Sequence, residues 1–401
     1  MPRDTEPGLR AGSSAYRRAA LALVCAGLAT FNALYTTQAL LPRIVTEFHV
    51  SIATAALTVS AATASLALCV VPAAILSERY GRGKTLIISV LAATSIGLVV
   101  PLAPTIEVLI ALRALQGAFI AGVPAAAMTW ISEEIHLRDI STTVGLYIAG
   151  TSVGGITGRL IPTLALGVTD WRWSILISSG CALLLAITTA LVLPSQRGFT
   201  PTRLNVKNNT IAALALWRQV PLAVLFCCSF ILMGVFVSLF NVIGFRLIDD
   251  FGFHESHVGL LFLLYLAGTY TSARAGRIIT RFGHGATLIA GSIAMVLGVA
   301  LCAGTEPFLG CGLLLFIAAF FLMHSTASAA ISQRATTNTA QASGMYVLMY
   351  YLGSSVLGWA SGYVYDVTGW YGFLIWLTGW LVLLIVLIMV VNHHMKQGDA
   401  P

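Results

Sequence analysis

Few charged or titratable side chains fall inside the long apolar stretches of this chain, and those few could do chemistry. Arg113 lies about seven residues into one such stretch, with Gln116 one helical turn further on. A charge near the centre of a membrane helix costs on the order of 2.5–3.5 kcal/mol. We therefore expect Arg113 to bind an anionic group or to gate proton movement. The alternative is that its long side chain extends to the nearby membrane interface.

His324 is the only histidine at mid-span depth. An imidazole changes charge near physiological pH, so His324 is a candidate proton carrier. The alternative is a neutral imidazole held by a hydrogen bond between helices. Arg159 lies close to the end of another apolar stretch, where it either joins a polar pathway between the helices or anchors the helix at the interface.

Polar side chains at similar depth are predicted to line a polar pathway between the helices. Any one of them could instead form an interhelical hydrogen bond, which contributes under about 2 kcal/mol. These residues are Asn32, Thr36, Gln38, Tyr147, Ser152, Asn241, Tyr270, Tyr350 and Tyr351.

Acidic residues are absent from these depths, because none of the fifteen Asp and Glu residues falls in the middle of an apolar stretch. An exporter of lipophilic cations usually needs a buried carboxylate that exchanges a proton for its substrate. We therefore expect a solute that is neutral, zwitterionic or anionic. Paired carboxylates, a nucleophile–base pair and metal-ligand spacing are also not evident in the sequence, so we expect no enzyme activity, no metal and no cofactor.

The elements that position these residues are membrane helices. The chain has 401 residues, of which 58% are apolar and 9% charged, with a mean hydropathy of +0.88. Soluble domains carry about a quarter charged residues. A helix needs roughly 20 apolar residues to cross the bilayer, and lipid leaves backbone groups no other partner. Twelve apolar runs meet this need, at 20–41, 53–76, 85–102, 107–131, 142–163, 173–193, 219–245, 257–279, 286–304, 309–331, 342–363 and 371–391.

Basic residues orient these runs. With the N-terminus inside, seventeen Lys and Arg residues, Arg3 and Arg203 among them, fall on the cytoplasmic side and four on the outer side. This bias predicts a multi-pass protein of the bacterial inner membrane with both termini in the cytoplasm. The net charge of +7 lies in short clusters between apolar runs, which indicates a membrane surface rather than nucleic acid.

The chain divides into two similar halves. A Pro- and Arg-containing connection over 194–218 separates an N-terminal half, 1–193, from a C-terminal half, 219–401, with six spans each. "RYGRGKTL" at 79–86 matches "RFGHGATL" at 281–288, an offset of 202, and "VTDW" ending at Trp171 matches "VTGW" ending at Trp370, an offset of 199. Parallel repeats of six spans are typical of a large class of secondary transporters.

Short motifs carry a family resemblance. The turn after the second span resembles motif A of the major facilitator superfamily, with Ala74, Leu76, Glu78, Arg79, Gly81 and Arg82. A second copy has Gly276, Arg281 and Gly283, with Thr280 where the acid would be. Arg113, Gln116 and Gly117 resemble motif B, and the glycines from Gly145 to Gly158 resemble motif C without its Gly-Pro pair. Further segments, such as "LYTTQALLP" and "YYLGSS", resemble the YnfM-type branch, also called arabinose-efflux-like or drug:proton antiporter.

This resemblance implies a function. It implies a monomeric transporter that moves a small organic solute by alternating access between its halves, in a rocker-switch motion. Glu78 of motif A would pair with arginines and a helix N-terminus of the other half and so latch one state. We expect proton-coupled efflux; the alternative is a proton-independent facilitator or importer of a small organic anion or sugar.

Overall fold

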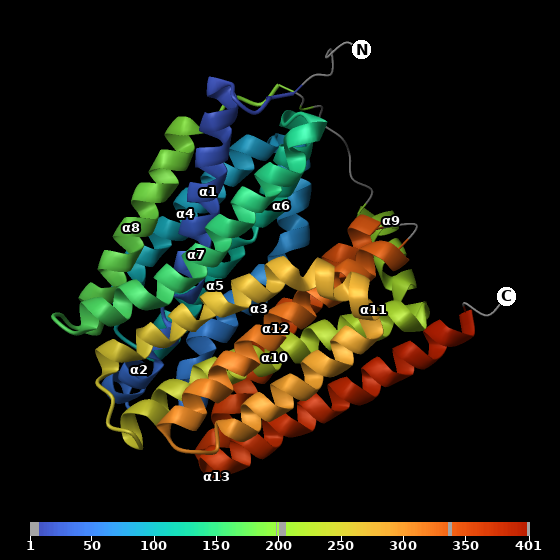
Figure 1. The fold of residues 1–401 in the computed structure, drawn as a ribbon. Helices are drawn as coiled ribbons and strands as arrows, with labels where there is room; N and C mark the ends of the chain where they lie inside the picture. The colour runs from blue at the N-terminus through green and yellow to red at the C-terminus, as the bar shows by residue number, and fades with distance from the viewer. Residues whose placement is uncertain (1–7, 198, 200–205, 336–338, 399–401) are drawn as a thin grey trace. The chain divides into compact units, whose positions relative to one another are not determined.

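The computed structural model describes residues 8–197, 199, 206–335 and 339–398, almost all of them helical (Figure 1). Arg3 and Arg203, two of the basic residues used for orientation, lie outside these residues. The helices of ten or more residues are α1 (Ser14–Tyr35), α3 (Ile52–Tyr80), α4 (Arg82–Val99), α5 (Ile106–Ile120), α6 (Gly122–Glu134), α7 (Ile140–Leu166), α8 (Trp171–Val192), α9 (Val206–Ala215), α10 (Val220–Asp249), η5 (Glu255–Leu264), α11 (Tyr265–Leu301), α12 (Glu306–Arg334) and α13 (Thr339–Gly398). The shorter ones are η1 (Gln38–Leu40), α2 (Leu41–Phe48), η2 (Val100–Leu102), η3 (Leu137–Asp139) and η4 (Leu216–Arg218).

The described residues contain nine helical runs that are long and apolar enough to cross a membrane. The run in α11 and the run in α13 each hold two helices, joined at Gly283 (φ 79°) and Gly369 (φ 66°). A left-handed φ costs glycine little, so the chain can turn sharply at both points. α7, which is rich in glycine and threonine, adds a further helix of 27 residues. The described residues therefore place a helix at each of the twelve predicted positions, and the all-α polytopic fold is confirmed.

The first compact unit comprises residues 1–44 and 61–204. In it α1 packs along α7 and α8, while α4 packs against α6 and α8. A stripe of Gly150, Gly154 and Gly158 on α7 faces the α1 backbone. A Cβ on Gly150 would lie 2.5 Å from the Val24 carbonyl oxygen, and one on Gly154 would collide with the Leu28 carbonyl. The glycines therefore permit close approach of two helices, as they do in other membrane proteins.

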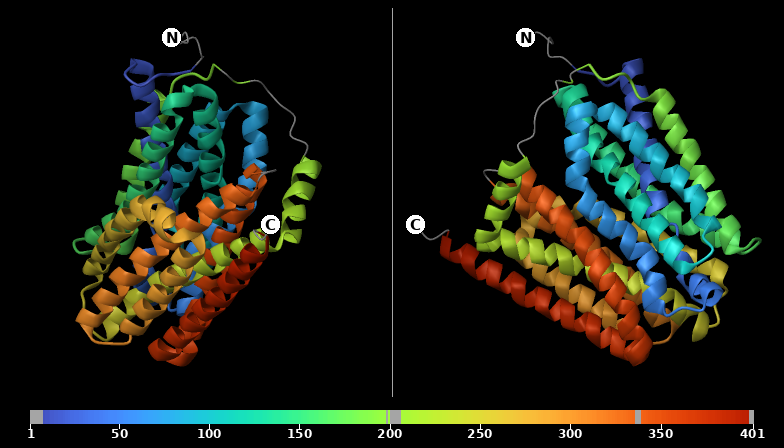
Figure 2. Two further views of the ribbon diagram at one scale, coloured as in Figure 1. Left: turned by 45° about the vertical axis from the view of Figure 1, so that its right-hand side comes forward. Right: turned by 180° about the vertical axis from the view of Figure 1, so that it is seen from behind.

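The second compact unit comprises residues 45–60 and 205–401, so it includes the first nine residues of α3. Within it α10 packs along α13, and α11 packs along α12 (Figure 2). The predicted linker over 194–218 lies partly outside the described residues, and α9 and η4 occupy its second half. The predicted division into halves at this linker stays a prediction.

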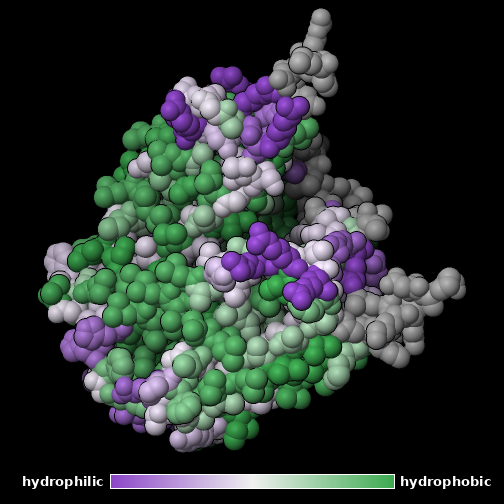
Figure 3. All heavy atoms as spheres, viewed as in Figure 1, coloured by the Kyte–Doolittle hydropathy of each residue, from purple (hydrophilic) through white to green (hydrophobic). Residues whose placement is uncertain are grey.

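Apolar side chains cover the flanks of the helices in each unit, and hydrophilic ones gather near helix ends (Figure 3). Leu102, Val168, Leu184 and Ile375 are examples of large apolar residues that are largely exposed. A soluble monomer rarely exposes so much contiguous apolar surface. This distribution fits helices whose flanks are solvated by lipid.

Candidate functional site

A break in α1 is the structural basis of the polar centre in the first unit. α1 ends at Tyr35, and the chain passes through η1 into α2 within one long apolar run, 14–48. Pro42 has no N–H with which to bond the Gln38 carbonyl four residues earlier, so one α-helical hydrogen bond is lost here and a 3-10 turn, η1, separates the two helices. The last four carbonyls of a helix have no partner within it. The Thr36 hydroxyl compensates one of them by donating to the Asn32 carbonyl at 2.7 Å.

Arg113 binds two of the carbonyls at this break. It lies on α5 with 1% of its surface exposed. Its Nη1 donates to the Ala33 carbonyl at 2.7 Å and also to the Gln116 side-chain oxygen, and its Nη2 donates to the Leu34 carbonyl. Gln116 in turn donates to the Ala93 carbonyl of α4 at 2.9 Å. Arg113 is therefore a buried cation held by neutral oxygens at the C-terminal end of a helix, where the helix dipole favours positive charge.

Arg159 approaches the same break from α7. With 2% of its surface exposed, it donates from Nε to the Gln38 side-chain oxygen at 2.7 Å and from Nη1 to the Gly155 carbonyl at 2.5 Å. Its guanidinium carbon lies 3.8 Å from the centre of the Tyr35 ring, in a cation–π contact. In this structure the side chain is buried between α1 and α7 rather than extended into solvent. Tyr35 was not identified as a site residue from the sequence. Its position next to Thr36, a predicted pathway residue, was the signal that could have indicated it.

The structure brings most of the predicted pathway residues of the first unit to this break. Asn32 donates to Thr157 at 3.3 Å and accepts from Ser178 at 3.1 Å, so it joins α1 to α7 and α8. Tyr147 and Ser152 lie apart. The Tyr147 ring packs in an apolar cluster, and the half-buried Ser152 donates to the Ile148 carbonyl of its own helix.

Aromatic rings surround His324 in the second unit. His324 Nδ1 lies 2.9 Å from the Tyr346 hydroxyl, and its half-buried ring lies 4.9 Å from the Tyr350 ring and stacks on Phe320 at 6.1 Å. Tyr351 meets Tyr350 edge-on at 5.3 Å. Three of the predicted residues, His324, Tyr350 and Tyr351, are therefore brought together by α12 and α13.

A buried aromatic cluster extends this centre and was not identified from the sequence. Phe236 on α10 stacks on Phe320 with ring centres 3.8 Å apart, and Phe240 contacts Tyr265 and Phe262. In the sequence, Phe236, Phe240 and Phe320 look like ordinary apolar residues that pack helices together. No sequence pattern therefore distinguishes an aromatic cluster beside a functional site from the rest of the apolar core.

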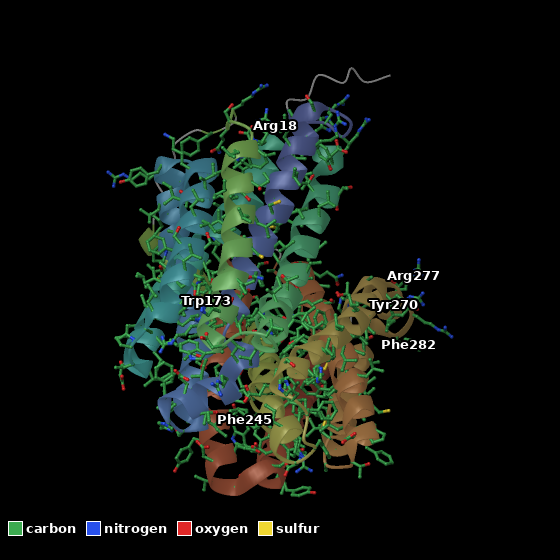
Figure 4. All side chains as sticks on the ribbon, turned by 90° about the vertical axis from the view of Figure 1, so that its left-hand side faces the viewer. Arg18, Trp173, Phe245, Tyr270, Arg277 and Phe282 are labelled. Atoms are coloured by element: carbon green, nitrogen blue, oxygen red, sulfur yellow. The ribbon has the colours of Figure 1, made fainter. Side chains whose placement is uncertain are left out.

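Two other predicted residues of the second unit lie elsewhere. Asn241 is buried and donates to the Gly358 carbonyl at 3.2 Å, which links α10 to α13. Tyr270 has 57% of its surface exposed, and the Arg274 guanidinium carbon lies 4.2 Å from its ring centre. Figure 4 shows Tyr270 near the same end of the unit as Arg277 and Phe282.

The first copy of motif A forms an ionic network within its own unit. Gly81 has φ 104° and makes the turn between α3 and α4. Arg82, which is buried, lies 3.4 Å from Glu78 and 3.2 Å from Glu133, and donates to Ser77 at 3.0 Å. Arg79 is exposed beside Tyr80.

The second copy keeps the turn but differs in charge. Gly283 is left-handed like Gly81, and Arg281 is exposed beside Phe282. Gly276 has open space where a Cβ would stand. Thr280 donates to the Gly276 carbonyl at 2.8 Å and supplies no carboxylate.

Comparison with known proteins agrees with this helical framework. The sequence profile of the Major Facilitator Superfamily matches residues 20–354. The Inner membrane transport protein YnfM of Escherichia coli (strain K12) is 37% identical over 392 residues, which cover 97% of this chain and 93% of that one. A solved nucleoside transporter, NupG, aligns with a TM-score of 0.76 at 16% identity over 92% of this chain and 99% of that one. A D-xylose-proton symporter aligns with a TM-score of 0.76 at 14% identity over 94% and 97%.

The fold and these matches define a class, the polytopic helical membrane transporters built from two six-helix repeats. The chain belongs to the Major Facilitator Superfamily, and it is a transporter of a small solute.

Proposed function

We propose that this transporter exports a small neutral, zwitterionic or anionic organic compound by alternating access, driven by proton entry. The observation that carries the solute class is the buried Arg113, whose described hydrogen bonds end on neutral oxygens. Arg159 adds a second buried guanidinium at the same helix break. The sequence provides no carboxylate in the middle of a span, so this centre suits an anionic or neutral solute group better than a lipophilic cation.

Proton coupling is proposed to pass through His324. Its ring is the titratable imidazole of the aromatic centre, and the Tyr346 hydroxyl at 2.9 Å could exchange a proton with it. Tyr350 and Phe320 offer flat surfaces on which a planar solute group could stack. In this proposal, Asn32, Thr36 and Gln38 tune the cationic centre, while Glu78 and Arg82 hold the motif A turn in shape.

A second candidate is a proton-independent facilitator or importer of a small organic anion or sugar. It is favoured by the packing of His324, because a ring fixed by Tyr346 and Phe320 is also what a purely structural histidine would show. The location we propose for either candidate is the bacterial inner membrane with both termini cytoplasmic, as the distribution of basic residues and the name of the Escherichia coli relative support.

Flux measurements in proteoliposomes test these proposals. Purified protein would be reconstituted with an imposed pH gradient and offered small acids, sugars and drugs. We expect gradient-dependent flux of an anionic or neutral compound, and loss of the gradient dependence in His324→Ala. Strong gradient-driven efflux of ethidium-like cations would contradict the solute class. Flux that ignores the gradient in both proteins would favour the facilitator.

A further inference from the structure

A turn of the same sequence pattern follows the second helix of each repeat, at Gly81 and at Gly283. Each turn and the helix ends around it are called a corner here, and the two corners differ in charge. In the first unit, the corner holds three carboxylates. Glu78 and Glu133 pair with Arg82, and Glu134 accepts from the Arg197 backbone amide at 2.7 Å. These carboxylates offset the basic residues around the turn at Gly81.

Corresponding positions in the second unit can be assigned from two alignments. The turn aligns at an offset of 202, which places Thr280 where Glu78 stands. The sequence "ISEE" closes α6 at residues 131–134, and "ISQR" closes α12 at residues 331–334. Gln333 and Arg334 therefore replace Glu133 and Glu134. All three carboxylates are absent from the second corner, and one position has become a cation.

Basic residues gather at this second corner. Arg274, Arg277 and Arg281 are exposed and spaced by three and four residues, so they lie along one face of α11. Six acidic residues follow residue 218. Asp399 lies outside the described residues. The other five lie near the opposite ends of the helices; they are Asp249, Asp250, Glu255, Glu306 and Asp366.

His284 is the residue of this corner that most directly indicates a ligand. It occupies the position of Arg82, and its Nε2 is buried without a hydrogen-bond partner among the described residues. It lies in the turn outside the apolar spans, where burial and the nearby Arg334 charge lower the pKa of its imidazole. A new helix begins just after Gly283, and the first amides of a helix favour an anion. An anion here would accept a hydrogen bond from the imidazole and would be attracted by the Arg334 charge.

We propose that this corner, defined by Arg277, Arg281, His284 and Arg334, binds a phosphate group, either of an anionic lipid or free in the cytoplasm. Tyr270 and Phe282 flank it with 57% and 59% of their surfaces exposed. Figure 4 shows Tyr270, Arg277 and Phe282 near the same end of the unit. Exposed aromatic rings beside cations are typical of the level of lipid headgroups. The orientation proposed above assigns this end to the cytoplasmic leaflet.

The test measures phosphate binding on the purified full-length protein. Native mass spectrometry would count bound phosphatidylglycerol, with phosphatidylcholine as the neutral comparison. A thermal-shift series would compare inorganic phosphate with chloride at equal ionic strength. Arg281→Gln and Arg334→Glu alter the proposed corner, and the latter restores the charge of Glu134. Arg79→Gln is the matched control, because Arg79 is the exposed arginine at the corresponding position of the carboxylate-containing corner.

We expect Arg281→Gln to weaken phosphatidylglycerol binding about fivefold and Arg334→Glu about tenfold or more, while Arg79→Gln changes it little. A phosphate-specific thermal shift that Arg334→Glu abolishes would indicate that free phosphate also binds, and its absence would assign the site to lipid. Equal losses in Arg79→Gln and Arg281→Gln would overturn the proposal, since they would reflect only general surface charge. If Arg334→Glu fails to fold, the exposed Arg281 decides the result alone.

Discussion

The first helix of each repeat differs between the two units, and this difference decides what kind of side chain can be buried beside it. α1 ends at Tyr35 in the middle of an apolar run, whereas α10 continues for 30 residues without a break. The broken helix leaves carbonyls that Arg113 binds, and the unbroken helix satisfies its own backbone and presents Phe236 and Phe240 to its neighbours. Backbone continuity thus separates a cationic centre from an aromatic one.

The helix break also explains how an arginine can be buried in a repeat whose spans contain no mid-span acid. The C-terminal end of a helix carries a partial negative charge, so its carbonyls stabilise a guanidinium as well as accept its hydrogen bonds. In the second unit α10 is continuous over its 30 residues, and His324, a residue that can be neutral, occupies the aromatic centre. The two centres therefore predict different responses to substitution.

Removing the cation from the broken helix has the largest expected effect. Arg113→Leu leaves the Ala33 and Leu34 carbonyls buried without their donor, which costs about 2–4 kcal/mol. We expect the melting temperature to fall by about 2–5 °C and solute flux to be lost. Thermal unfolding in detergent and flux in proteoliposomes check both effects.

Arg113→Lys separates the two roles of this side chain, because lysine keeps the charge without the planar fork of donors. If Arg113→Lys transports the solute but remains unstable, the positive charge is what transport needs. The planar set of guanidinium donors is then what stabilises the helix break. The exposed Arg18 provides a control, and Arg18→Gln should alter neither measurement. If Arg113→Leu kept wild-type stability and flux, Arg113 would not be needed to stabilise the carbonyls at the end of α1.

The aromatic centre is expected to respond in a different way. His324→Phe keeps a flat ring against Phe320 and Tyr350 but removes the titratable nitrogen, so stability should change by less than about 1.5 kcal/mol. We expect flux down a solute gradient to persist and accumulation driven by a pH gradient to fall about tenfold. Parallel assays with and without the pH gradient measure the two separately. Equal accumulation by His324→Phe and wild type would eliminate the imidazole as proton carrier.

The sequence predicted the framework far better than the sites. Twelve helix positions followed from hydrophobic length alone, because lipid allows each apolar run few other structures. The sequence also indicated that Arg113 and Arg159 were unusual. It did not indicate that both meet at one helix break, because this depends on how α5 and α7 pack against α1. The faces on which Tyr147 and Tyr270 lie were also not predictable, since depth along a helix does not specify which face a side chain takes; their place in the pathway stays a prediction.

The glycine stripe tests whether close packing of α7 on α1 is needed to hold the broken helix. Gly154→Val would drive a side chain into the Leu28 backbone, and overpacking of this kind costs about 1–3 kcal/mol. Gly145→Ala on the same helix meets open space and should be neutral or slightly stabilising. Thermal unfolding of the two variants measures the contrast. Similar melting temperatures would mean that α7 can move away from α1 without loss.

The smallest expected effect comes from the arginine–aromatic pair at the surface of the second unit. Arg159 and Tyr35 form such a pair in the buried centre of the first unit, whereas Arg274 and Tyr270 form theirs in an exposed position. An exposed cation–π contact contributes about 0.5–1 kcal/mol, so Tyr270→Leu should lower the melting temperature by only about 1 °C. Tyr35→Leu should cost more, because the buried Arg159 loses a ring as well as packing. Transport by Tyr270→Leu at the wild-type rate would place Tyr270 outside the solute pathway. Loss of transport with normal stability would support the prediction that Tyr270 lines that pathway.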